Sequence, residues 1–100
     1  MAGRTLRWTL KAEDELLEIL AYYRVRNDNS EYGDKLVLKF HERMGYVVAN
    51  PYSGQPAPKK GFRYVIVYPF QLFYYVAKKE VVVASVWDAR RNPDTLKLTR

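Results

Sequence analysis

The 100-residue sequence contains no cysteine and only one histidine, His41. Without cysteine, disulfides, thiolate catalysis and cysteine-based zinc sites are excluded, which is compatible with a reducing cytoplasm. A transition metal would have to bind carboxylates alone, and the clustered ones at positions 13, 14, 15 and 18 point in different directions around a helix. Neither a Walker phosphate loop nor a GxGxxG turn is present. We therefore expect no metal and no cofactor, and a surface or boundary position for His41.

Long apolar runs are also missing from the sequence. The longest falls far short of the roughly 20 residues that cross a bilayer, and residues 1–8 lack the apolar core of a signal peptide. We therefore expect a cytoplasmic protein of bacterial type without a membrane partner. The length and the 48% hydrophobic content fit a single compact domain, residues 1–100.

Negative charge is scarce in the second half of the chain. Residues 1–50 hold eight Lys or Arg against eight Asp or Glu, and residues 51–100 hold nine against three. The formal net charge of +6 therefore arises entirely from the second half. Such asymmetry favours an anionic partner, either nucleic acid or an acidic protein, although a merely soluble basic protein would show it too.

Three consecutive runs in the second half are typical of β-strands. Residues 62–68 and 71–77 are dense in Val, Ile, Phe and Tyr, and only Pro69 and Phe70 separate them, which predicts a tight hairpin. Residues 81–87 are almost continuously apolar, so this strand should lie inside the sheet. The three residues before it are too few for a crossover helix, which predicts antiparallel neighbours.

The first half predicts one strand and two helices. Residues 4–8 alternate as a strand does, and Thr9 is placed to cap a helix that ends near Arg26. Asp28 or Ser30 can cap a second helix that ends near residue 49. Each helix carries an apolar stripe with three-to-four spacing, which requires a packing partner.

These elements predict an α+β fold. An N-terminal strand and an antiparallel two-helix hairpin should pack on one face of a mostly antiparallel sheet of about four strands. The proline-rich residues 50–58 should form the loop that leads from the second helix into the sheet.

Charged side chains gather where the last buried strand ends. Arg90 and Arg91 could bind phosphate or carboxylate bidentately, or they could form a solvent-exposed strand end that binds no ligand. Arg63 lies among apolar neighbours at the start of the sheet, so it should reach a carboxylate, a carbonyl or the sheet margin. Asp88 is one candidate for its partner.

Short motifs spread over nearly the whole chain carry a family resemblance. In chain order they are Ala12 in the capped first helix, Asn50-Pro51 with Gly54 soon after the second helix, Gly61-Phe62-Arg63 opening the sheet, Phe73-Tyr74 in the next strand, and VWDARRNP at residues 86–93. In this order and spacing they resemble the RelE/ParE superfamily of type II toxin–antitoxin toxins, the plasmid-stabilisation toxins.

The resemblance implies a small toxin that a cognate antitoxin neutralises by wrapping its surface. It leaves two targets open. RelE-like members cut messenger RNA in the ribosome with basic residues and often a C-terminal tyrosine, whereas ParE-like members inhibit DNA gyrase and are not known as nucleases.

Three positions depart from the RelE-type pattern. The arginine of the middle strand falls on Gln71, whose neutral amide cannot stabilise developing phosphate charge as a guanidinium does. The arginine after the last strand falls on Ala89, although Arg90 could replace it by a one-residue shift, and the C-terminal tyrosine falls near Thr95. Only the basic positions that precede the sheet are matched, by the lysines at 59 and 60.

ParE-like inhibition of DNA gyrase is therefore the first hypothesis. Its residues for contacting the target or the antitoxin would be Arg63, Trp87, Asp88, Arg90 and Arg91. The alternative is a ribosome-dependent messenger RNA endonuclease that uses Lys59, Lys60, Arg90 and Arg91. A non-toxic homologue that still binds its antitoxin is a third reading, and the sequence fits a homodimer as well as a toxin–antitoxin hetero-oligomer.

Overall fold

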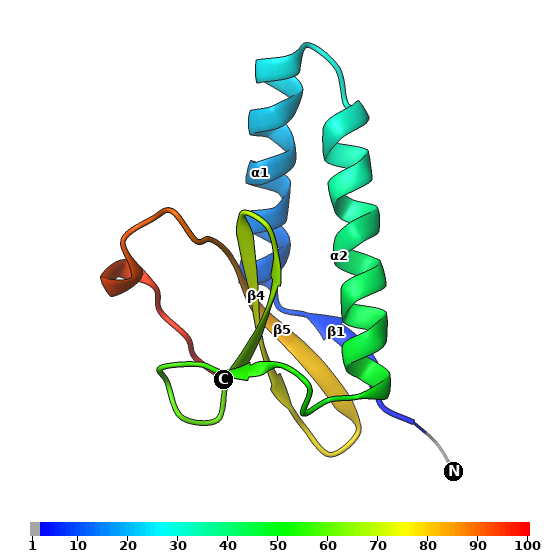
Figure 1. Cartoon of the computed structure of the whole chain (residues 1–100), viewed down its shortest axis with the longest axis vertical. Helices are drawn as coiled ribbons and strands as arrows, with labels where there is room; N and C mark the ends of the chain where they lie inside the picture. The colour runs from blue at the N-terminus through cyan, green and yellow to red at the C-terminus, as the bar shows by residue number, and fades with distance from the viewer. Residues whose placement is uncertain (1–2) are drawn as a thin grey trace.

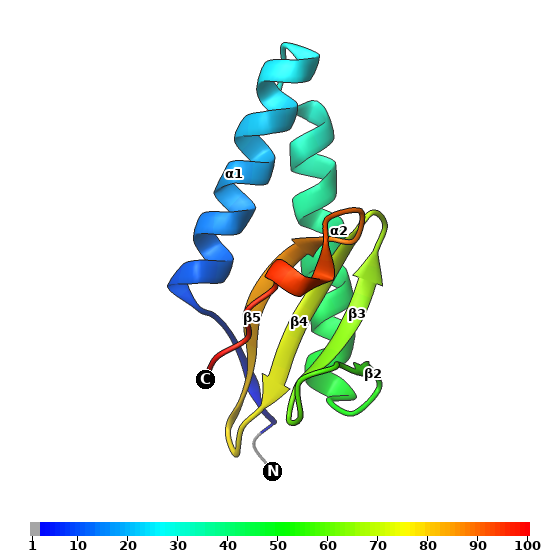
Figure 2. The same cartoon turned by 90° about the vertical axis from the view of Figure 1, so that its left-hand side faces the viewer.

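The structure, a computed structural model, describes residues 3–100 as two helices packed on one face of a five-stranded sheet (Figures 1 and 2). The order of strands across the sheet is β1-β5-β4-β3-β2. The elements in chain order are β1 (Thr5–Trp8), α1 (Leu10–Asn27), α2 (Glu31–Ala49), β2 (Gln55–Pro56), β3 (Arg63–Val67), β4 (Phe70–Val76), β5 (Glu80–Asp88) and a short 3₁₀ helix (Pro93–Thr95). The α+β architecture predicted from the sequence is thus confirmed.

The three predicted strands of the second half are present and antiparallel. β3 pairs with β4, and β4 pairs with β5. The apolar β5 lies inside the sheet, because β1 pairs with its other edge in parallel. The hairpin turn consists of Tyr68 and Pro69, one residue earlier than expected, since Val67 already pairs with Phe70. The predicted loop at 50–58 contains a fifth, two-residue strand, β2, which pairs with β3.

Thr9 caps α1 as predicted, because its hydroxyl accepts a hydrogen bond from the backbone N–H of Ala12 at 3.1 Å. Ser30, one of the two predicted alternatives, occupies the N-cap position of α2, but its side chain does not cap the helix. The side chain of Asn29 accepts from the Glu31 N–H at 3.0 Å, and Ser30 makes no capping bond. Asp28 instead ends α1 in the left-handed region, at φ 56°.

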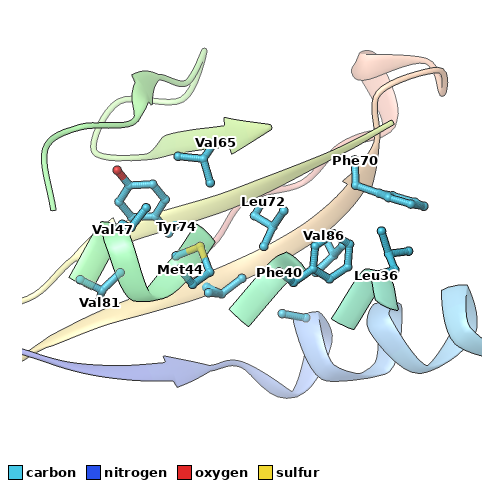
Figure 3. Close-up of a cluster of buried hydrophobic side chains, with 12 residues drawn as sticks. Leu36, Phe40, Met44, Val47, Val65, Phe70, Leu72, Tyr74, Val81 and Val86 are labelled. Carbon is cyan, nitrogen blue, oxygen red and sulfur yellow. The ribbon is translucent and has the colours of Figure 1, made fainter. Parts of the chain in front are cut away.

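The main core lies between the helices and the sheet (Figure 3). α2 contributes one buried stripe, which faces buried side chains of β3, β4 and β5: Leu36, Phe40, Met44 and Val47 against Val65, Phe70, Leu72, Tyr74, Val81 and Val86. The hydroxyl of fully buried Tyr74 is satisfied, since it donates to the Pro51 carbonyl and accepts from the Gly54 N–H. A Cβ at Gly54 would lie 2.3 Å from this hydroxyl, so the loop can approach only with glycine there.

A second apolar cluster covers the opposite face of the sheet. Phe62, Phe73 and Trp87 are buried there, and the C-terminal tail closes over them with Leu96 and Leu98. Lys59 holds the tail through a hydrogen bond from its ammonium to the Leu98 carbonyl at 2.5 Å. The sheet is therefore covered on both faces, by helices on one side and by the tail on the other.

Candidate functional site

The segment after β5 is organised around the carboxylate of Asp88. One oxygen accepts from the backbone N–H of Arg90 at 2.9 Å and from its Nε at 3.0 Å, and the other accepts from its Nη2 at 2.8 Å. The backbone N–H of Arg91 donates to the Asp88 carbonyl at 3.0 Å, which closes the turn. The bidentate contact with the carboxylate fixes the orientation of the Arg90 guanidinium.

This ion pair shifts the pKa of both partners. The hydrogen bonds from Arg90 hold the pKa of the Asp88 carboxyl below its usual range, with a further contribution from the Arg91 charge. The same bonds to Asp88 raise the pKa of Arg90. Both groups are therefore charged at every physiological pH, and the segment presents a fixed guanidinium to solvent.

A groove of about 360 Å³ lies between this segment and α1. Arg90, Arg91 and Asp88 line one wall, and α1 supplies the other with Glu15, Glu18, Ile19, Tyr22 and Tyr23. Tyr22 and Tyr23 stack edge to face, with ring centroids 5.0 Å apart. The groove thus combines two cations, acidic groups and aromatic rings, a mixture suited to a peptide segment.

Glu15 holds α1 against the sheet at the base of this groove. Its Oε1 accepts from the Ser85 hydroxyl at 2.9 Å and from the Val86 N–H at 3.1 Å. β1 ends opposite Val83, so the edge of β5 beyond that residue has no strand partner. The carboxylate takes the place of the missing strand and satisfies the one buried polar side chain of the described core, Ser85.

Trp87 does not fit the contact role predicted for it. Its side chain is only 5% exposed and belongs to the cluster under the tail. The guanidinium of Arg91 lies over its ring at 4.5 Å, so the tryptophan supports Arg91 and offers little surface of its own. The continuous apolar run that predicted β5 already carried this signal, because it placed both faces of the strand under cover.

Arg63 lies at the other end of the sheet and is not paired with Asp88. Its Nη1 donates to the carbonyls of Gly54 at 2.9 Å and Tyr52 at 3.3 Å. The general expectation of a carbonyl partner is confirmed, and the pairing with Asp88 is wrong. Arg63 pairs in register with Tyr74, which pairs with Val83, five residues before Asp88 on β5. A bulge takes up one of these five residues, because the same stretch of β4 spans only four, so the two backbone positions are about 14 Å apart along the strands.

The basic residues proposed for a nuclease do not converge. Lys60 lines a hollow beside Arg63, whereas Arg90 and Arg91 line the groove at the opposite end of the sheet. Lys59 and Gln71 do meet, in a cavity of about 240 Å³ on the face under the tail. Of the described residues that line this cavity, Lys59 is the one cation, and its ammonium is bonded to the Leu98 carbonyl.

Several residues of these sites were not singled out from the sequence. In the sequence Glu15 is one of several neighbouring carboxylates on a helix, and its bond to β5 depends on a contact 70 residues away. Tyr52 lies in the proline-rich loop, where no local signal predicts that its ring lies 5.4 Å from the Arg63 guanidinium. His41 is exposed, as predicted, and its ring lies 6.0 Å from that of Trp8. Among residues 3–100, no three metal-ligating side chains gather, and no helix is both long and apolar enough to cross a bilayer.

Comparisons with known proteins agree on one family. The sequence model of the ParE toxin of type II toxin–antitoxin systems, parDE, matches residues 6–93. A solved structure of the chromosomal ParDE toxin–antitoxin system from P. aeruginosa superposes with a TM-score of 0.72 and 27% sequence identity. That match covers 84% of this chain and 94% of the other. No curated protein sequence matches the chain.

Proposed function

The chain belongs to the ParE toxin family of type II toxin–antitoxin systems, and from this premise we propose that it inhibits DNA gyrase and is neutralised by a cognate antitoxin. The observation that carries the choice of target is the dispersal of the basic side chains. Lys59 and Gln71 lie where the RelE-type pattern has basic residues, and both line one cavity. Lys59 is the one cation among the described residues of that cavity, and its ammonium is already bonded to the Leu98 carbonyl. Developing phosphate charge would find no convergent guanidinium there.

The target surface that we propose is the segment Asp88–Arg91. Arg90 is held by Asp88, and Arg91 lies over the Trp87 ring, so both cations are oriented before any partner binds. Such preorganisation reduces the entropy lost on binding, and charge-assisted bonds to partner carboxylates or phosphates gain most from it. Arg63, whose donors are partly used by two backbone carbonyls, is a secondary candidate at the far end of the sheet.

The antitoxin contact that we propose is the groove between α1 and the Asp88–Arg91 segment. Its two tyrosines and Ile19 offer apolar surface, and the arginines attract an acidic chain. An antitoxin segment in this groove would cover Arg90 and Arg91, which explains neutralisation by direct occlusion. The same arrangement predicts a hetero-oligomer of toxin and antitoxin, in which the groove is buried.

The test is gyrase supercoiling of a relaxed plasmid, titrated with the refolded chain and with its antitoxin added back. We expect inhibition that the antitoxin reverses. The double variant Arg90→Gln/Arg91→Gln should need at least about tenfold more protein, because each charge-assisted bond is worth about 1.5–3 kcal/mol. The matched control, Lys35→Gln/Lys39→Gln, removes the same charge from exposed positions on α2 and should inhibit as the wild type does.

Circular dichroism must first show that each variant is folded. Absence of inhibition by folded wild-type chain would overturn gyrase as the target. Cleavage of messenger RNA in a translation extract by the same preparation, reduced in Lys59→Gln, would favour the ribonuclease alternative. Equal inhibition by the arginine double variant and the wild type would remove the proposed surface and leave the target in place.

A further inference from the structure

Positive side chains gather at the end of the sheet where β3 begins and β4 turns into β5. Lys78 and Lys79 form that turn, and Arg4 is held beside it by a bond from its Nε to the Ala77 carbonyl at 2.8 Å. Lys60 precedes β3, and Arg100 reaches the same place by a bond from Nη2 to the Gly61 carbonyl at 3.2 Å. We call this set, with Arg63, the basic end of the sheet.

Negative charge hardly offsets this cluster. On the segments that form the basic end, Glu80 is the one described acidic residue, and it is engaged with Arg7 at 2.6 Å. Two other acidic residues lie in the second half. Asp88 ends β5 at the opposite end of the sheet, and Asp94 lies in the 3₁₀ helix that follows. The cations of the basic end are therefore little opposed by acidic groups on the same segments, and such a basic patch is typical of a phosphate-binding surface.

The basic end contains a hollow of about 400 Å³ in which cations alternate with aromatic rings. Its cationic lining is Lys60, Arg63 and Arg100, its aromatic lining is Tyr52, Phe62 and Tyr75, and no Asp or Glu side chain takes part. The Arg63 guanidinium lies 5.4 Å from the centre of the Tyr52 ring, and the Arg100 guanidinium lies 4.4 Å from that of Tyr75.

Backbone bonds hold the two guanidinium groups but leave donors free. Arg63 uses only Nη1, for the carbonyls of Tyr52 and Gly54, and the Arg100 contact uses only Nη2. A guanidinium carries five N–H donors, so each group keeps several for an incoming anion. Lys60 is exposed and can close on the same anion.

We propose that the basic end of the sheet binds single-stranded nucleic acid. A backbone phosphate takes the free donors of Arg63, Arg100 and Lys60, and a neighbouring base stacks on Tyr52, whose side chain is 62% exposed. The lysines of the β4–β5 turn attract the next phosphates along the strand. The carboxylates of an acidic peptide would bind the cations but would not stack on the aromatic rings. In a paired duplex the bases are stacked on one another, so none is free to enter the hollow.

This binding does not depend on the gyrase proposal. Along the strands the basic end lies about 14 Å from Asp88, as the register shows, and the two proposed surfaces have no residue in common except Arg63, the secondary candidate for the target. No cleavage is implied, because the binding needs no group that activates a nucleophile. The proposal can therefore be tested on oligonucleotides without gyrase or the ribosome.

The experiment is fluorescence anisotropy of a labelled 12-nucleotide oligo(dT), titrated with the purified full chain at several salt concentrations. If about three phosphates are neutralised, log K should fall with log salt with a slope of about −2. Affinity should then drop about 20-fold between about 50 mM and about 200 mM salt. Lys60→Gln should weaken binding at each salt concentration, because it removes one of the three cations on the shared phosphate, whereas Lys39→Gln on α2 should not.

The aromatic part of the proposal has its own matched pair. Tyr52 and Tyr46 are both exposed tyrosines beside an arginine, at 5.4 Å from Arg63 and 5.6 Å from Arg43. Tyr52→Ala should weaken binding about fivefold or more, as loss of a base-stacking ring does, and Tyr46→Ala should not. Both are surface changes, and circular dichroism shows whether each variant is folded.

Four results would overturn the proposal. The first is no binding at the lowest salt, and the second is an equal loss of affinity within a matched pair, either the Lys60 and Lys39 variants or the two tyrosine variants. The third is a duplex of the same length that binds as tightly as the single strand. The fourth is a 12-residue oligoglutamate that competes as well as the oligonucleotide. The last result would assign the basic end to an acidic protein segment.

Discussion

At the scale of single residues, the contact between Asp88 and Arg90 decides what the candidate target surface presents. Three hydrogen bonds between two residues so close in sequence leave little freedom to either side chain. The carboxylate neutralises part of the arginine charge, so its main effect is to aim the guanidinium. Because the pair lies at the surface, its effect on the free energy of unfolding is small.

The Asp88 carboxyl should titrate below the usual aspartate pKa of about 3.9, because Arg90 stabilises the charged form. The pair's contribution to stability is therefore present above the unfolded-state pKa and is lost as the pH falls through the folded-state pKa. Arg90→Gln should raise the pKa of Asp88, and Arg91→Gln should raise it less. Carboxyl-detected NMR titration of the three proteins measures this, and an Asp88 pKa unchanged by Arg90→Gln would contradict it.

At the scale of elements, the junction of α1 with β5 positions the groove. β1 is too short to pair with the whole of β5, and the Glu15 carboxylate satisfies the Ser85 hydroxyl and the Val86 N–H where the strand partner ends. Tyr22 and Tyr23 line one wall of the groove, and Arg90 and Arg91 line the other. Glu15 thus connects the helix of the first wall to the strand that leads into the second.

Glu15→Ala should lower the free energy of unfolding by about 1–3 kcal/mol, because it leaves a buried hydroxyl and a backbone N–H without an acceptor. The control is Glu18→Ala, one turn along α1, where the exposed carboxylate makes no hydrogen bond within residues 3–100 and the cost should be near zero. Urea denaturation followed by circular dichroism compares them. Equal stability of the two variants would show that the junction does not depend on Glu15.

The elements themselves could be predicted because their signals are local. Periodicity fixed α1, α2 and the three long strands, and the hydroxyl of Thr9 marked the start of α1. The cap by Asn29 was missed because several residues of one turn could serve equally well. β2 was missed because two residues in a proline-rich loop become a strand only when β3 lies beside them.

The candidate site was only partly predictable, because its parts are brought together by contacts distant in sequence. The charged segment at Asp88–Arg91 was visible as a change of composition after an apolar strand. Arg63 lies at the end of the sheet opposite to Asp88 because of the strand register, and a sequence without tight-turn residues does not specify that register. The burial of Trp87 depends on the C-terminal tail, whose path the sequence did not reveal.

At the scale of the whole molecule, the sheet separates the two proposed binding surfaces as well as two apolar clusters. The groove at one end mixes charges of both signs, and the basic end carries nearly unopposed positive charge. The tail spans the face between them, and it lies almost entirely beyond residues 6–93, the part matched by the family. It nevertheless completes the second core, so its removal affects the fold and both surfaces together.

Leu98 tests how strongly the tail stabilises the molecule. Its side chain is 6% exposed in the cluster with Phe62 and Trp87, so Leu98→Ala should lower the free energy of unfolding by about 2–5 kcal/mol. Thr99→Ala, at the exposed neighbouring position, should leave it nearly unchanged. Urea denaturation followed by tryptophan fluorescence measures both variants, with Trp87 beneath the tail and Trp8 at the main core both contributing to the signal. A Leu98 variant as stable as the Thr99 variant would mean that the tail is not part of the core. If the expected loss is found, a shortened chain that fails to inhibit gyrase must be shown to fold before the failure is assigned to a lost contact.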